Sequence, residues 1–276
     1  MRLSLEIKPF SFSLVKPLQT FHGIIQDKQG WLVKIQNAYG DCGWGEIAPL
    51  AHAEMKSCSS ILKTIGASPL RESLEECISS SAGALGFGLG SALAELDCLI
   101  GNTEDNKWLK APKSAVLLNN DTKSLLTQLD IIANNKKEDN QSITIKWKVC
   151  TKTDLIEEEL LHHVLERLPD NSLLRIDANT GWDRCQANHW ASFFINDQRL
   201  EWFEQPLPTN DFEGLLALSK KIPIALDESL VINPSLKNTW KSWQIRRPAL
   251  EGDPRLLIKE LNQGKSHIAI STSFET

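Results

Sequence analysis

The feature that most constrains this fold is a regular alternation of short apolar runs and amphipathic segments from residue 114 onward. Each apolar run has strand-like composition, and the segment after it spaces its apolar residues as a helix does. Strands and helices that alternate in this way build a parallel sheet. The predicted strands cover residues 115–118, 143–149, 173–177, 200–204, 222–227, 243–246 and 267–271.

The spacing of these strands favours a barrel over an open sheet. Successive strand ends recur at steps of roughly 20 to 30 residues, which is typical of a (β/α)₈ barrel. No Gly-x-Gly-x-x-Gly motif opens a helix, as a doubly wound dinucleotide-binding sheet would require. Chemically reactive residues instead follow one strand after another, as they do at the mouth of a barrel.

The first third of the chain has a different organisation. Apolar segments at 3–15 and 30–36 predict a small antiparallel sheet, and helical patterns follow at 53–65, 70–79 and 87–100. A polar run at 101–107 then marks a boundary. We therefore predict an α+β domain at residues 1–105 and a barrel domain at residues 106–276.

Composition excludes several classes of protein. No apolar run approaches the roughly 18 residues that span a bilayer, so we expect no membrane association. The net charge of −5 without a basic stripe argues against a nucleic-acid partner. Six scattered cysteines without a Cys-x-x-Cys pair predict reduced thiols, and the N-terminus lacks a secretory pattern, so we expect a cytoplasmic location. The sequence does not indicate an oligomeric state.

Three consecutive predicted strands end in an acid: Asp177, Glu204 and Asp227. Neighbouring barrel strands lie ~4.8 Å apart, so these side chains can converge at the C-terminal mouth. A set of oxygen ligands with room for water and substrate favours Mg²⁺ over zinc. Each acid taken singly is more typical of a helix N-cap, but three in register beside lysines favour a metal site.

Two lysines share one face of the predicted strand at 143–149. Lys146 and Lys148 stand two residues apart, opposite Ile145 and Trp147, so both can point into the barrel mouth. A partly desolvated lysine near another cation has a lowered pKa and can act as a base near pH 7. The alternative is an edge strand with solvated lysines. The spacing between these lysines and Asp177 favours an active site over that alternative.

Four short motifs, in this order, resemble the catalytic signature of the muconate-lactonizing-enzyme-like branch of the enolase superfamily. They are Lys146-x-Lys148, Asp177-Ala178-Asn179, Glu204-Gln205-Pro206 and Asp227-Glu228-Ser229. Three further segments add a likeness to dehydratases of that branch: 43–50, 93–97 and 175–179. The resemblance covers nearly the whole chain, and the combination is specific although each motif alone is weak.

The resemblance implies a capping domain over a modified (β/α)₇β barrel, with Mg²⁺, or Mn²⁺, held by Asp177, Glu204 and Asp227. It implies a small carboxylate substrate, 2-succinyl-6-hydroxy-2,4-cyclohexadiene-1-carboxylate, that loses water by syn elimination during menaquinone or phylloquinone synthesis. Lys148 would move the proton while Mg²⁺ and Lys146 stabilise the developing charge. Four residues would surround the metal or the substrate: Arg175, Asn179, Ser271 and Ser273.

The chain departs from the family pattern at Arg247, where a second lysine is usual. Arginine keeps the positive charge but cannot act as a base at its very high pKa. Racemisation of N-succinyl amino acids and epimerisation of dipeptides need two proton-transfer groups, whereas syn dehydration needs only Lys148. The departure therefore favours dehydration over these sister activities.

The chain also ends at Thr276, directly after the seventh predicted strand, so we expect the last barrel unit to be absent from it. A non-catalytic homologue that serves as a binding scaffold is the remaining alternative. Retention of Lys146, Lys148 and the three acids argues against it.

Overall fold

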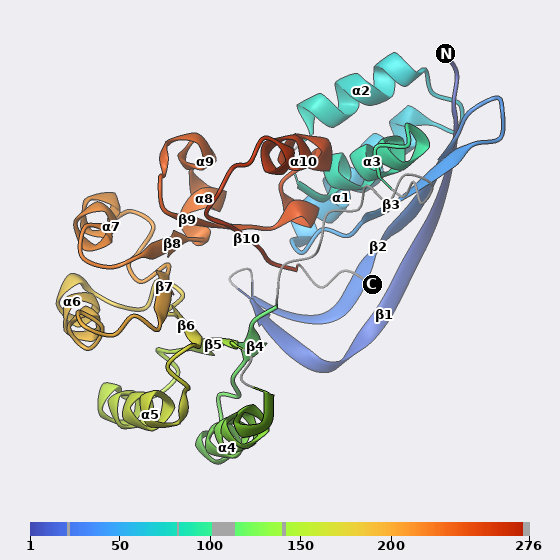
Figure 1. The fold of residues 1–276 in the computed structure, drawn as a ribbon. Helices are drawn as coiled ribbons and strands as arrows, with labels where there is room; N and C mark the ends of the chain where they lie inside the picture. Colours follow the sequence, from blue (N-terminus) through green and yellow to red (C-terminus); the bar gives the residue numbers. More distant parts are fainter. Residues whose placement is uncertain (21–22, 82, 101–113, 140–141, 273–276) are drawn as a thin grey trace. The chain divides into compact units, whose positions relative to one another are not determined.

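A computed structural model describes residues 1–20, 23–81, 83–100, 114–139 and 142–272 (Figure 1). The chain forms two compact units. The first comprises Met1–Lys110, Arg246–Ser266 and Ile270–Thr276, and the second comprises Ala111–Ile245 and His267–Ala269. The domain boundary predicted at residue 105 lies outside the described residues, so the predicted division stays a prediction.

The first unit begins with a three-stranded antiparallel sheet in the order β1-β2-β3. Its strands are β1 (Ser4–Thr20), β2 (Gly23–Gln36) and β3 (Cys42–Ile47). Alternate residues of the strands are buried, including Leu5, Val33 and Ile35, because side chains of a strand point to opposite faces in turn. One face of this sheet therefore belongs to the core of the unit.

Three helices follow the sheet: α1 (His52–Ile65), α2 (Arg71–Ser80) and α3 (Gly83–Leu96). Helix α3 is glycine-rich and packs directly on β3. A Cβ atom added at Gly45 would lie 1.9 Å from the carbonyl oxygen of Gly88. The helix and the strand therefore approach at backbone distance, which only glycine allows here.

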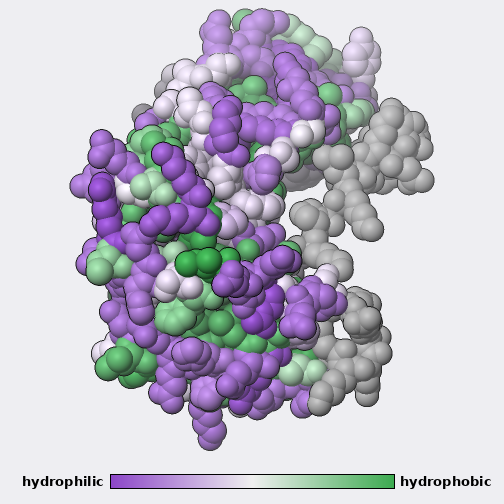
Figure 2. All heavy atoms as spheres, turned by 60° about the vertical axis from the view of Figure 1, so that its left-hand side comes forward, coloured by the Kyte–Doolittle hydropathy of each residue, from purple (hydrophilic) through white to green (hydrophobic). Residues whose placement is uncertain are grey.

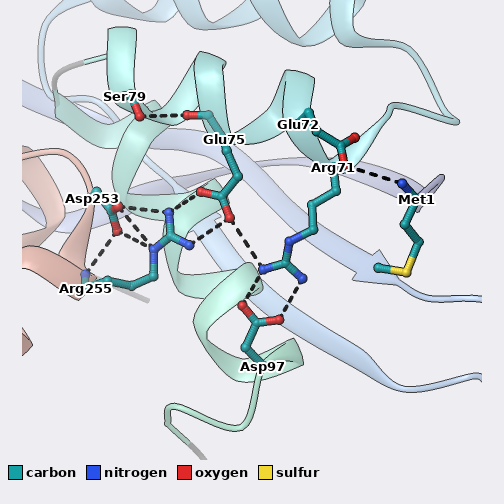
Figure 3. Close-up of polar contacts among 8 residues, drawn as sticks. All are labelled: Met1, Arg71, Glu72, Glu75, Ser79, Asp97, Asp253 and Arg255. Atoms are coloured by element: carbon teal, nitrogen blue, oxygen red, sulfur yellow. Dashed lines mark hydrogen bonds and ion pairs between the residues drawn. The ribbon is translucent and has the colours of Figure 1, made fainter.

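A later segment of the chain belongs to the same unit. It carries η1 (Pro248–Leu250) and α10 (Pro254–Asn262). Figure 3 shows how polar contacts join this segment to α2: Arg255 donates to both carboxylate oxygens of Glu75, at 3.1 and 2.7 Å. Arg71 in turn contacts Glu75 at 3.4 Å and donates to Asp97 at 2.8 and 2.5 Å. Asp253 caps α10 and also accepts from Arg255.

The remaining strands form a seven-stranded sheet in the order β10-β9-β8-β7-β6-β5-β4, and neighbouring pairs from β4 to β9 are parallel. The strands are β4 (Val116–Leu117), β5 (Thr144–Lys148), β6 (Leu173–Asp177), β7 (Leu200–Glu204), β8 (Ile224–Leu226), β9 (Trp243–Arg246) and β10 (Ile268–Ile270). Figure 1 shows them along a curved line.

Helices alternate with these strands in the second unit, on the outer side of the curve (Figure 1). They are α4 (Thr122–Asp139), α5 (Asp154–Arg167), α6 (Arg184–Ser192), α7 (Phe212–Ser219), α8 (Glu228–Ile232) and α9 (Leu236–Thr239). Asp183 and Asp211 cap α6 and α7 by accepting from backbone N–H groups. Ile145, Trp147, Leu174 and other buried side chains form the core between strands and helices.

This architecture confirms the predicted fold class, with an N-terminal antiparallel sheet and helices and a curled parallel sheet of barrel type. The six cysteines are free, in agreement with the predicted reduced thiols. Hydrophilic residues cover most of the face drawn in Figure 2. Among the described residues no helix is both long enough and apolar enough to cross a bilayer.

Candidate active site at the strand ends

The second unit brings three acids to the carboxyl ends of three adjacent strands. Asp177 is the last residue of β6, Glu204 is the last residue of β7, and Asp227 directly follows β8. Asp177 and Glu204 are register partners across the two strands. All three acids are buried, with 1%, 1% and 3% of their surface exposed. Buried carboxylates need compensation by a cation or by hydrogen bonds.

Two lysines of β5 point at these acids, because Ile145 and Trp147 occupy the opposite, helix-covered face of the strand. Lys146 Nζ lies 2.9 Å from Asp177 Oδ2 and 2.7 Å from Glu204 Oε1. Lys148 Nζ lies 3.7 Å from Asp177 Oδ2. Lys148 is the more exposed lysine, so it is the one that faces solvent beside the acids.

The pKa of Lys146 is controlled by the two acids that it contacts. Burial lowers the pKa of Lys146, but the charges of Glu204 and Asp177 outweigh it, so its pKa is raised above the ordinary value. Its contacts therefore favour the protonated form of Lys146. Two acids in direct contact have a larger effect than the neighbouring cation.

The acids repel one another strongly. Burial, followed by the negative charge of Asp177, raises the pKa of Glu204 to about 8, although Lys146 acts in the opposite direction. Among the described residues, no group of three or more His, Cys, Asp or Glu side chains stands close enough together to hold a metal ion as it is placed. Lys146 instead bridges two of the acids.

Asn179 lies between Lys148, the predicted base, and Glu228, a residue to which the sequence assigned no role. Its Oδ1 accepts from Lys148 Nζ at 3.3 Å, and its Nδ2 donates to Glu228 Oε1 at 3.2 Å. Burial, followed by the charge of Asp227, raises the pKa of Glu228 to about 7. In the sequence, Glu228 appeared only as a member of the Asp227-Glu228-Ser229 motif, without a role of its own.

Arg175 lies two residues before Asp177 in β6, so the two side chains share one face of the strand. Its guanidinium group donates to Glu201 at 2.6 and 3.4 Å and stacks on the Trp202 ring, 4.0 Å from the ring centroid. Arg175 and Glu201 are both largely buried. The structure thus engages the guanidinium group of Arg175 in an ion pair, whereas the family resemblance implied a place on the substrate side.

The remaining predicted site residues lie outside the second unit. Arg247 and Ser271 belong to the first unit, where Arg247 Nη1 lies 3.3 Å from Ser271 Oγ. Arg247 also donates its backbone N–H to Glu251 at 2.7 Å. Ser273 lies outside the described residues. The structure therefore brings together Lys146, Lys148, Asp177, Asn179 and Glu204, with Asp227 at the next strand end.

Comparison with known proteins agrees with this geometry. Residues 133–239 match the family model described as "Enolase C-terminal domain-like". The chain is 28% identical to an o-succinylbenzoate synthase of Thermosynechococcus vestitus, over 91% of this chain and 77% of that protein. It is 30% identical to an o-succinylbenzoate synthase of Photorhabdus laumondii, over 75% of this chain and 60% of that protein.

An o-succinylbenzoate synthase is also found among the solved structures with a similar fold. A crystal structure of o-succinylbenzoate synthase from Thermosynechococcus elongatus BP-1, complexed with Mg in its active site, superposes with a TM-score of 0.78 at 25% identity. It covers 99% of this chain, which spans 85% of that one. An L-Ala-D/L-Glu epimerase from Bacillus subtilis, at 17% identity and a TM-score of 0.69, shares the fold.

The parallel sheet with acids at successive strand ends agrees with these matches, which show that the chain has the fold of the enolase superfamily. Within that superfamily, the curated relatives that it resembles are o-succinylbenzoate synthases. The chain spans 77% of the length of the first of these relatives and about 60% of the second.

Proposed function

We propose that the chain is an o-succinylbenzoate synthase, a hydro-lyase that removes water from 2-succinyl-6-hydroxy-2,4-cyclohexadiene-1-carboxylate. The observation that carries the proposal is the group of three buried strand-end acids beside two lysines, in a chain whose curated relatives have this activity. The product would enter menaquinone or phylloquinone synthesis. A cytoplasmic location belongs to the same proposal, supported by the free cysteines.

The donor set suits a divalent cation. Three buried carboxylates offer the oxygen ligands that Mg²⁺ prefers, and a cation among them would offset the burial and the Asp177 charge that raise the pKa of Glu204. Asp177, Glu204 and Asp227 would hold Mg²⁺ or Mn²⁺. The bound cation would neutralise charge that develops on the substrate carboxylate, the kind of stabilisation that commonly contributes most to catalysis.

Lys148 would carry both proton transfers. Its ammonium group is the exposed one of the pair, and Asn179 orients it through a 3.3 Å hydrogen bond. In its neutral form Lys148 would take the proton from the carbon next to the carboxylate. The same group would then return a proton to the departing hydroxyl, so that water leaves from the face where the proton was removed and the ring becomes aromatic.

Lys146 would act as a fixed cation. Its contacts with Asp177 and Glu204 favour its protonated form, so Lys148 rather than Lys146 would act as the base. Its position suits the stabilisation of negative charge at the reacting carboxylate. Residues with the weaker assignments, Arg247, Ser271 and Ser273, stay candidates for contacts with the substrate.

Dehydration is favoured over racemisation. Racemisation and epimerisation need an acid and a base on opposite faces of one carbon, and arginine at position 247 cannot be the second base. Two epimerases among the structural neighbours are 17% and 18% identical and share only the fold. A non-catalytic scaffold is less well supported, because a chain without catalysis would not need two lysines aimed at buried acids.

The test is conversion of the cyclohexadiene substrate to o-succinylbenzoate, followed by absorbance with and without Mg²⁺. Lys148→Ala should abolish turnover, whereas Lys123→Ala, an exposed lysine on α4, should leave it unchanged. Incubation with an N-succinyl amino acid measures racemisation in parallel. Racemisation at a rate comparable with dehydration, or no turnover by the folded chain, would contradict the proposal.

A further inference from the structure

A completely buried glutamine occupies the space between the strand ends that carry the acids. Gln205 directly follows Glu204 at the end of β7, and 0% of its surface is exposed. Its backbone has φ of +35°, in the region that residues other than glycine seldom adopt. A strained backbone and a buried amide at one residue call for a reason in the surrounding structure.

All four hydrogen-bonding positions of the Gln205 amide are used. Its Oε1 accepts from the backbone N–H groups of Asp227, at 3.1 Å, and Ser229, at 3.0 Å. Its Nε2 donates to the carbonyl oxygen of Leu207 at 3.1 Å and to Ser229 Oγ at 2.8 Å. A glutamine amide offers two donors and two acceptor positions, so this side chain has no capacity left for a ligand.

The backbone of Gln205 makes two further hydrogen bonds to the segments around these strand ends. Its N–H donates to the carbonyl oxygen of Ala225 in β8, at 2.8 Å. Its carbonyl oxygen accepts from the N–H of Thr180, at 2.8 Å, in the segment that follows β6. One residue therefore contacts the segments after β6 and β8 from the end of β7, and these three strand ends carry Asp177, Asp227 and Glu204.

We propose that Gln205 is a positioning residue that fixes Asp227 relative to Glu204, and thereby sets the geometry of the metal site. It acts through the backbone N–H of Asp227 and contacts neither substrate nor metal. This inference rests on the proposed function, because it presumes that these acids hold a divalent cation. Partners outside the ligand set commonly contribute about 10- to 100-fold to metal affinity.

Gln205→Met tests this role, because methionine has similar length but cannot accept from the backbone of Asp227 and Ser229. The matched control is Gln244→Met. Gln244 is also buried, at 3% exposure, but it lies on β9 and its Nε2 donates to the carbonyl oxygens of Lys237 and Trp240, at 3.0 and 3.2 Å. Both substitutions remove hydrogen bonds of a buried amide. Gln244 pairs with Leu226 through its backbone, but its side-chain amide hydrogen-bonds to Lys237 and Trp240, whereas the Gln205 amide hydrogen-bonds to Asp227 itself.

The measurement is the Kd of Mn²⁺ for the full chain, determined by electron paramagnetic resonance, with unfolding recorded for each variant. We expect Gln205→Met to raise the Kd by about 10-fold or more. Gln244→Met should lower stability without changing the Kd. An unchanged Kd in folded Gln205→Met, or an equal rise in Gln244→Met, would overturn the positioning role.

Two further outcomes are informative. If Gln205→Met does not fold, Ser229→Ala removes only the hydroxyl group that Gln205 Nε2 contacts. Weaker Mn²⁺ binding by Ser229→Ala supports the positioning role, and unchanged binding overturns it. Failure of the unsubstituted chain to bind Mn²⁺ would overturn the proposed function together with this inference, whereas loss of the Gln205 effect alone leaves the proposed function intact.

Discussion

Replacement of Glu157 by alanine should destabilise the second unit strongly. Glu157 lies in the first turn of α5, is 1% exposed, and accepts from the loop that follows Lys148. The backbone N–H groups of Cys150, Thr151 and Lys152 donate to its carboxylate at 2.8, 2.8 and 3.0 Å. The Thr151 hydroxyl donates to the same carboxylate at 3.2 Å. The side chain therefore fastens the β5–α5 loop to the start of the helix.

The magnitude follows from these contacts. Four hydrogen bonds at a net ~1 kcal/mol each correspond to about 4 kcal/mol of unfolding free energy. At a urea m-value of ~3 kcal/mol/M, the midpoint of unfolding should fall by about 1.3 M. Fluorescence of the buried Trp147, Trp182 and Trp190 reports on this unit.

The control for this prediction is Glu159→Ala, an exposed acid two residues further along α5. It should change the unfolding free energy by no more than ~0.5 kcal/mol. A loss of less than ~1 kcal/mol in Glu157→Ala would refute the reasoning, because it would mean that solvent replaces the carboxylate at almost no cost.

Three further predictions concern other parts of the molecule. The side chain of Arg255 lowers the pKa of Glu75, so the stabilisation from Glu75 is present above its unfolded pKa and is lost as pH falls through the folded value. Thermal unfolding should show that Glu75→Gln is less stable than the parent chain at pH 7 and that this difference disappears as the pH falls below the lowered pKa. The exposed Glu76→Gln should show no such difference. Gly45→Ala should cost about 3 kcal/mol in urea unfolding, since its Cβ would lie 1.9 Å from the Gly88 oxygen, and an unchanged midpoint would contradict the close packing. Removal of the divalent cation with a chelator should abolish turnover but leave the far-UV circular dichroism spectrum unchanged. Asp177 and Glu204 already contact the ammonium group of Lys146, so the fold does not depend on the metal to compensate their charge.

Much of the fold was predictable because it depends on local patterns. The period of two in β5 and β6 and the helical spacing between them identify the barrel series without knowledge of distant contacts. The acids at 177, 204 and 227 were identifiable because each directly follows an apolar strand. The pairing of Asp177 with Glu204 then follows from the geometry of a parallel sheet, because both residues end neighbouring strands.

Other features depend on contacts that no local pattern reveals. Glu75 and Arg255 pair across 180 residues of sequence, so neither residue alone indicates that α10 contacts α2. The role of Gln205 depends on backbone groups that carry no sequence signal. The raised pKa of Lys146 follows from two acids that the fold brings within 3 Å of it.

The pairing of β6 with β7 contains a register shift between Leu174 and Arg175. Leu174 pairs with Leu200 and Arg175 pairs with Trp202, so β7 carries one additional residue, Glu201, at this point. Such an extra residue is a β-bulge, and here it brings the carboxylate of Glu201 within 2.6 Å of the Arg175 guanidinium group. Without Glu201 the pairings on either side of it would join into one regular ladder, and Glu204 would still lie opposite Asp177. Loss of Phe203 would instead shift Glu204 by one position relative to Asp177 and turn its side chain to the other face. The same strand should therefore tolerate a deletion at the bulge and lose its acid from the site after a deletion two residues later.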